Sequence, residues 1–276
     1  GVRVEREQQQ RDFSMLMRGN WVNAVLDQGK TFTLPKLVLQ YQIANHTTLS
    51  ASARQGYNAG GGAFNGLTNA YYYYGSESVN TYELSSRSVL QGGNTSISAN
   101  LFYNDFKDYQ ALSSTRTITN IDQAHSYGLE LEAYTMLNNN WQLHSSLGLL
   151  HSKIDKAAAG FDQAIGNELN SAPSLTASLG VSYWLSDEWK LDVSSNYVGE
   201  FYGDLNNTEE RIAGDYVLTR ASANYSSDAW MLSVFVNNAF DEYGITSRDP
   251  VSVTYPNGYV AMVNPRTVGA SVTYSF

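Results

Sequence analysis

The stretch TVGASVTYSF, residues 267–276, decides the fold class of this chain. Apolar side chains occupy every second position from Val268 to Phe276, and glycine, serine or threonine fills the positions between them. Because successive side chains of a β-strand point to opposite faces, this alternation predicts a strand with one apolar and one polar face. The strand ends on an aromatic residue at the last position of the chain.

The same alternation recurs along the chain in segments of about ten residues, the pattern of transmembrane β-barrels. Clear examples are residues 37–43, 127–133 and 230–236. A membrane-spanning helix would need about 20 consecutive apolar residues, and the sequence has no such run. Since only helices and closed barrels satisfy their backbone groups in lipid, the sequence predicts an all-β chain that forms a transmembrane, antiparallel, up-and-down β-barrel.

The connections between the segments alternate between long and short, which predicts about twelve strands with a defined polarity. The short connections are residues 44–47, 91–94, 138–140, 186–188 and 227–228. The long connections are residues 8–31, 57–78, 109–123, 155–173, 203–214 and 241–265. Outer-membrane barrels have short periplasmic turns and long extracellular loops, so we expect every short connection on the periplasmic side.

Aromatic residues at the strand ends support this polarity. Trp141, Trp189 and Trp230 each follow a short connection. Tyr41, Tyr183 and Tyr225 each precede one. Strand propensity explains aromatic residues within strands but does not place them at one end, whereas a membrane interface does. The sequence therefore predicts an aromatic girdle at the periplasmic interface.

Composition excludes some classes of function. The chain has 276 residues, 20 tyrosines, 22 glycines and a net charge of −9, which argues against nucleic-acid binding. The histidines lack metal-ligand spacing, and Glu130 and Glu132 have no nucleophile near them in sequence, so we expect no enzyme activity. Alternation already begins within residues 1–7, so we expect the sequence to be a fragment of a longer protein.

Short blocks in a fixed order carry a resemblance to a known family. They are LPKL at 34–37, RQGYNAGG at 54–61, YEL at 82–84, YGLELE at 127–132, NSAP at 170–173, VNNAFDEY at 236–243, NPRT at 264–267 and YSF at 274–276. Together they resemble the carboxyl-terminal part of the TonB-dependent outer-membrane receptors, particularly those for ferric siderophores. The resemblance covers essentially the whole chain.

The resemblance implies a fold and a set of partners. Residues 1–276 would form the later part of a plugged barrel of about 22 strands, with the plug and the early strands absent. The protein would lie in the outer membrane of a Gram-negative bacterium, surrounded by lipid, and import ferric siderophore with energy from the TonB complex, which contacts the absent plug. The barrel-assembly machinery would read Phe276. No cofactor is expected, because iron enters only within the siderophore.

The resemblance also implies substrate binding in an extracellular funnel. Bulky ferric chelates, some of them anionic, call for aromatic faces and a few arginines. The predicted substrate-binding residues are Arg54, Tyr57, Asn58, Tyr72, Tyr202 and Arg248. Arg116 and Arg211 also lie in long connections, which are expected to be outer loops. Alternatively, Arg54 forms an ion pair with Glu83, and the tyrosines at 71–74 pack as a loop clasp or rim.

Other functions remain open at this level. A barrel of about twelve strands could close by itself as a small porin or adhesin, since an even strand number permits closure. A self-contained outer-membrane hydrolase would need a serine and a histidine at one position of the lumen. His144 is expected to face the lumen, but no partner for it can be identified in the sequence.

Overall fold

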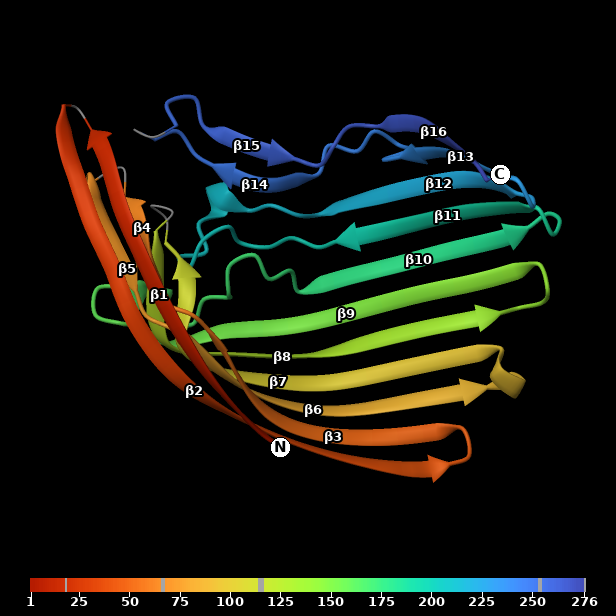
Figure 1. The fold of residues 1–276 in the computed structure, drawn as a ribbon, viewed down its shortest axis with the longest axis horizontal. Coiled ribbons are helices and arrows are strands. Elements are labelled where there is room, and N and C mark those ends of the chain that lie inside the picture. Colours follow the sequence, from red (N-terminus) through yellow and green to blue (C-terminus); the bar gives the residue numbers. More distant parts are fainter. Residues whose placement is uncertain (18, 66–67, 114–116, 253–254, 276) are drawn as a thin grey trace.

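The computed structural model describes residues 1–276 except 18, 66–67, 114–116, 253–254 and 276. One twelve-stranded antiparallel sheet dominates it (Figure 1). In spatial order its strands are β1 (Val2–Met17), β2 (Asn20–Ala44), β3 (Thr47–Asn58), β6 (Glu77–Leu90), β7 (Thr95–Leu112), β8 (Ile118–Met136), β9 (Trp141–Lys156), β10 (Leu175–Trp184), β11 (Trp189–Val198), β12 (Tyr216–Ser226), β13 (Trp230–Asn237) and β16 (Thr267–Tyr274). Each strand pairs with the one before it, so the predicted up-and-down order is confirmed.

Two small hairpins lie in the connections of this sheet. They are β4 (Gly61–Asn65) with β5 (Ala70–Tyr74), and β14 (Ile245–Asp249) with β15 (Tyr259–Met262). Short 3-10 turns complete the secondary structure: η1 (Gln91–Gly93), η2 (Asp162–Ala164) and η3 (Glu209–Arg211). Among the described residues, no helix is long and apolar enough to cross a membrane.

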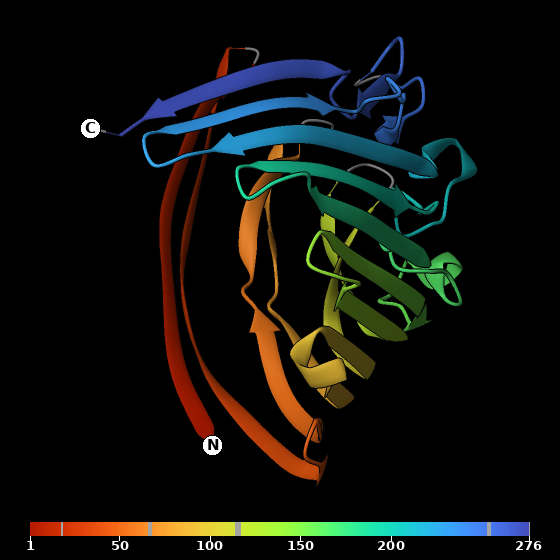
Figure 2. The ribbon, with the colours of Figure 1, turned by 90° about the vertical axis from the view of Figure 1, so that its right-hand side faces the viewer.

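The sheet curves strongly into an open trough (Figures 1 and 2). Its two edges are β1 and β16, which do not pair with each other over the described residues. Apolar side chains on one face are exposed: Leu179 is 56% exposed, Val193 49% and Val272 65%. These residues lie on the face that the sequence predicts to meet lipid. Alternation thus places an apolar surface on one side of β10, β11 and β16.

The opposite face of the sheet is polar. Across β10 to β13, Ser182 donates to Asp192 at 2.5 Å, Asn224 donates to Asp192 at 3.0 Å, and Ser233 donates to Asn224 at 2.7 Å. On β3, β6 and β7 this face lines a hollow of about 560 Å³ together with Glu130 and Glu132 of β8. The two glutamates are lumen-facing carboxylates on a polar wall, as the alternation predicts.

Five of the six aromatic residues predicted for the girdle form cross-strand ring pairs, with Tyr274 as the sixth ring, whereas Tyr41 is exposed at the end of β2. Trp141 contacts Tyr183 with ring centroids 4.4 Å apart, Trp189 contacts Tyr225 at 5.2 Å, and Trp230 contacts Tyr274 at 4.6 Å. The backbone N–H of each tryptophan donates to a side-chain oxygen in the turn before it, namely Asn138 at 3.0 Å, Ser186 at 3.2 Å and Ser227 at 3.2 Å. Each tryptophan therefore packs on a tyrosine of the neighbouring strand in the sheet.

A double-mutant cycle on Trp189 and Tyr225 is expected to give a coupling free energy of about 0.5–1.5 kcal/mol, the range for such aromatic pairs. The measurement is the free energy of unfolding of the full-length protein in lipid vesicles. The control is a double-mutant cycle on Tyr197 and Val217, which are paired farther along the same two strands. It measures the effect of losing buried side-chain area where two aromatic rings do not meet. A coupling free energy near zero for Trp189 and Tyr225 would mean that each ring contributes to stability independently of the other.

For two of the long connections, the prediction of a loop is wrong, because the structure shows mainly strand there. Residues 8–17 and 20–31 belong to β1 and β2, which pair from Val2 with Pro35 to Met17 with Asn20. Residues 109–123 also belong largely to strands, because β7 continues to Leu112 and β8 begins at Ile118. These outer ends extend beyond the residues that cross a bilayer, so their faces need not alternate between apolar and polar.

The remaining long connections pack on the outer ends of the strands. Ala111, Ile121, Ala124 and Ile154 of β7 to β9 form a buried cluster with Ala164, Leu169 and Leu205 from the connections 157–174 and 199–215. Burial of these side chains removes apolar surface from water and so favours the packed position of both connections. This cluster holds the two loops against the sheet at the end where the predicted substrate residues lie.

Candidate functional site

The candidate site lies at the outer end of the sheet. We define the vestibule as the described residues of the four connections 59–76, 157–174, 199–215 and 238–266, together with the tip of the β7–β8 hairpin, residues 110–112 and 118–120. The hairpins β4–β5 and β14–β15 belong to the first and last of these connections (Figure 1). The vestibule contains or borders every residue predicted to bind substrate.

The β4–β5 hairpin is fixed to β1 and β2 on one side. The Gln9 side-chain amide donates to the carbonyl oxygen of Gly60 at 2.8 Å, and the Tyr73 hydroxyl donates to that of Val25 at 2.5 Å. Phe13 of β1 packs on Tyr71 with ring centroids 4.8 Å apart. The tyrosine run therefore packs as a clasp, which was one of the alternatives.

On the other side the same connection is bonded to the β7–β8 tip. The Gln110 amide donates to the carbonyl oxygens of Ala59 at 2.7 Å and Gly75 at 3.0 Å. The backbone N–H of Ile118 donates to the Tyr72 hydroxyl at 3.0 Å. The Tyr72 hydroxyl thus helps to join this connection to the β7–β8 tip. A contact of Tyr72 with substrate stays a prediction.

Arg54 forms the ion pair with Glu83 that was its alternative role. Its two terminal nitrogens lie 2.6 Å and 3.0 Å from the two carboxylate oxygens, and the Ser52 hydroxyl also donates to Glu83 at 2.9 Å. Pairing of β2 with β3 ends at this level, where Lys36 is opposite Arg54. The bidentate geometry orients the guanidinium along the wall of the trough.

Tyr57 and Asn58 lie just beyond Arg54 on β3. The Tyr57 ring stacks on Phe32 of β2 with centroids 3.5 Å apart and planes 11° apart. The Asn58 amide donates to the Gln110 side-chain oxygen at 3.0 Å. The two residues therefore link the separating strands β2 and β3 to each other and to the β7–β8 tip.

Tyr202 and Arg248 lie in two other connections of the vestibule, 199–215 and 238–266. The carbonyl oxygen of Tyr202 accepts from the Ser171 N–H at 2.8 Å, which joins the connections 157–174 and 199–215. Arg248 is half-buried on β14, opposite Val260 of β15. Four of the six predicted residues thus lie on β3 or on the connection bonded to the β7–β8 tip, whereas Tyr202 and Arg248 lie on two different connections between β9 and β16. Arg116 and Phe276 lie outside the described residues.

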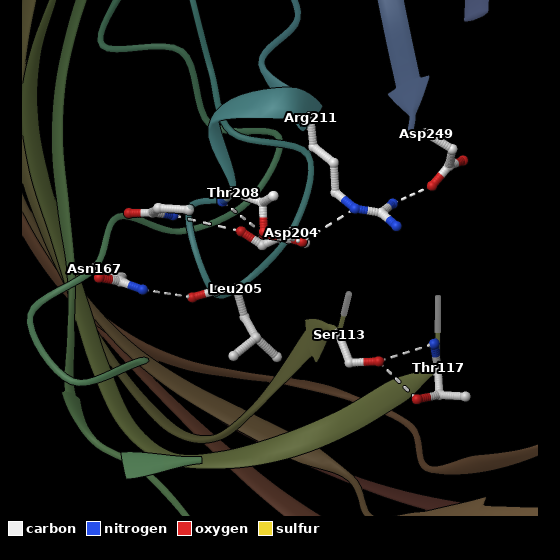
Figure 3. Close-up of polar contacts among 9 residues, drawn as sticks. Ser113, Thr117, Asn167, Asp204, Leu205, Thr208, Arg211 and Asp249 are labelled. Atoms are coloured by element: carbon white, nitrogen blue, oxygen red, sulfur yellow. Dashed lines mark hydrogen bonds and ion pairs between the residues drawn. The ribbon is translucent and has the colours of Figure 1, made fainter. Parts of the chain in front are cut away.

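Arg211 is the arginine whose role sequence reasoning missed. It is only 8% exposed and lies between two buried carboxylates, those of Asp204 and Asp249 (Figure 3). Asp204 also accepts from the Thr208 N–H at 3.1 Å and hydroxyl at 2.8 Å. The spacing of Asp204 and Thr208 could have predicted this local turn. No sequence signal could have predicted the pairing with Asp249.

Burial shifts two titratable groups near the vestibule. Both lie at outer strand ends, beyond the roughly ten residues next to the short turns that cross a bilayer. Burial raises the pKa of Tyr109 to about 12, and the nearby Glu77 carboxylate adds to the rise. Burial also raises the pKa of Glu77, although its hydrogen bond from the Gln110 N–H opposes this. Tyr109 therefore stays a neutral phenol at physiological pH.

Comparisons with known proteins agree with this architecture. The family model described as TonB dependent receptor-like, beta-barrel matches residues 1–239. Among solved structures, the ferric yersiniabactin uptake receptor FyuA from Yersinia pestis matches with a TM-score of 0.81 and 22% identity, over 100% of this chain and 42% of that one. The siderophore receptor PiuA from Acinetobacter baumannii matches with a TM-score of 0.74 and 16% identity, over 99% and 40%.

The ferric-catecholate import receptor Fiu from K12 E. coli, in its closed form, matches with a TM-score of 0.73 and 15% identity, over 100% of this chain and 42% of that one. At these identities the likeness concerns the fold. The chain spans about two fifths of the length of these receptors. Because the family model covers most of the sequence, the chain belongs to the TonB-dependent receptor family of outer-membrane β-barrels.

Proposed function

We propose that this chain forms part of an outer-membrane importer of ferric siderophores driven by the TonB complex. The observation that supports the proposal is the family match over residues 1–239, which includes three of the four connections of the vestibule. The vestibule also suits this cargo, because a bulky chelate needs aromatic faces and a few cationic groups, and the vestibule contains Tyr72, Tyr202 and Arg248.

In this proposal the cargo contacts the six predicted residues, Arg54, Tyr57, Asn58, Tyr72, Tyr202 and Arg248. Iron enters only as part of the chelate, so the barrel holds no resident cofactor and carries out no chemical step. Energy reaches the cargo through a plug segment that touches the TonB complex. Assembly into the outer membrane depends on recognition of Phe276 by the barrel-assembly machinery.

Uptake by the full-length protein tests the proposal. We expect that deleting its gene abolishes import of one iron-55-labelled siderophore, that a plasmid copy restores it, and that disrupting the TonB complex causes the same loss. Unchanged import of every siderophore and of cobalamin would overturn the proposal. A passive porin would differ in two ways, because it would conduct in planar bilayers and would not depend on the TonB complex.

Replacing Arg54 by alanine is expected to lower uptake strongly while changing stability little. Arg54 is exposed and its ion pair with Glu83 is partly solvated, so the pair contributes less than about 1 kcal/mol. The measurements are uptake of the chelate identified above and the free energy of unfolding. Lys36→Ala, at the register position opposite Arg54, is the matched control. Normal uptake by Arg54→Ala would show that Arg54 serves only the ion pair.

A further inference from the structure

The connection 199–215 is attached to the β14–β15 hairpin at two points. The Gly214 N–H donates to the carbonyl oxygen of Ile245 at 2.9 Å, and the Arg211 guanidinium pairs with the Asp249 carboxylate. Ile245 and Asp249 are the first and last residues of β14, so the two attachments are about 13 Å apart along the strand. One attachment would let the hairpin pivot, whereas two attachments fix its direction.

The Arg211 attachment is a buried charge cluster. Asp204 is 0% exposed, Asp249 2% and Arg211 8%. The Nε atom of Arg211 lies 3.3 Å from Oδ2 of Asp204, and its Nη1 atom contacts Oδ1 of Asp249 (Figure 3). Movement of the hairpin away from Arg211 would leave buried charges without their partners, which is strongly unfavourable. The ion pair therefore opposes rotation of β14.

Arg211 itself stands on a loop that is bonded to the rest of the vestibule. The Leu205 N–H donates to the carbonyl oxygen of Leu112 at 2.9 Å, and the Asn167 amide donates to that of Leu205 at 3.0 Å. Asn207 and Glu168 exchange two further hydrogen bonds of 2.7 Å and 3.0 Å. Arg211 therefore joins the β14–β15 hairpin to a loop that is already held on β7 and β9.

The direction of β14 also decides where Arg248 lies. Arg248 and Asp249 are consecutive in a strand, so their side chains point to opposite faces. When Asp249 faces Arg211, Arg248 is held on the other face of the hairpin. We propose that Arg211 is a positioning residue that fixes the β14–β15 hairpin and, through it, the place of Arg248 in the vestibule. The last step rests on the proposed function, but the fixing of the hairpin does not.

Distance measurements between spin labels test the proposal without any cargo. The chain contains no cysteine, so Glu210→Cys on the loop and Val260→Cys on β15 give one labelled pair. The measurement uses the full-length protein, purified in detergent, with any cysteine elsewhere replaced. We expect a single narrow distance peak that is lost in Arg211→Met and in Asp249→Asn and retained at least in part in Arg211→Lys, which keeps the charge.

Arg266→Met, which removes an exposed arginine from the same connection as β14, is the matched control and is expected to keep the peak. Resistance of the folded barrel to unfolding in detergent shows that each variant is folded. Asp249→Asn keeps the ion pair between Arg211 and Asp204, so this variant tests the proposal even if Arg211→Met does not fold. A narrow peak in Asp249→Asn, loss of the peak in Arg266→Met, or complete loss in Arg211→Lys would each overturn the proposal. Failure of siderophore uptake would not affect this result.

Discussion

Replacing Gly128 by alanine is expected to prevent β8 and β9 from pairing normally and to reduce sharply the amount of folded barrel. A Cβ atom at this position would lie 2.1 Å from the carbonyl oxygen of Leu149 and 2.7 Å from the Phe102 ring. The ring could rotate away, but the carbonyl belongs to the neighbouring strand, where Gly128 is paired with Leu150. Relief of the overlap therefore requires a shift of the sheet, at a cost of about 1–3 kcal/mol or more.

Gly29→Ala is the matched control for this prediction, because it adds the same methyl group to another strand. Its Cβ atom would lie 3.5 Å from the carbonyl oxygen of Glu7, an ordinary contact. The measurement is the fraction of full-length protein that resists unfolding in detergent and runs as a compact species on an unheated gel. Equal folded fractions for the two alanine variants would contradict the close approach of β8 and β9 at Gly128.

The wall of the barrel could be predicted from sequence because one physical constraint acts on every strand that crosses the membrane. Leu179 and Val193 face one side and Ser182 and Asp192 the other because one side of each strand meets lipid and the other does not. The constraint ends above the bilayer. Residues 8–17 of β1 pair with β2, yet the glutamines at 8–10 show no alternation, so the sequence predicted a loop there.

The same limit applies to the vestibule. The ion pair of Arg54 with Glu83 could be foreseen, since the two residues lie on neighbouring strands and the register brings them together. Arg211 and Asp249 are 38 residues apart in two different connections, and neither periodicity nor strand register relates them. Contacts made by loops depend on tertiary packing, so a charged loop residue that looks available in the sequence can be buried in the structure.

Replacing Leu179 by arginine is expected to destabilise the folded barrel by about 2–4 kcal/mol, the cost of this side chain on the lipid face near the bilayer midplane. Leu179 is the fifth residue of β10. Four residue steps of a tilted strand place it about 10 Å deeper than Tyr183, measured along the membrane normal. Leu179 is therefore close to the middle of the apolar band, where an arginine reaches water least easily.

Ser178→Arg is the control, because it places the same side chain on the same strand one residue away and on the opposite face. Ser178 shares a hydrogen bond of 2.7 Å with Ser146 and borders a hollow of about 250 Å³ with room for the longer side chain. We expect Ser178→Arg to change the free energy of unfolding in lipid vesicles much less than Leu179→Arg. Similar losses in the two variants would mean that both faces are equally buried, and the assignment of Leu179 to lipid would be wrong.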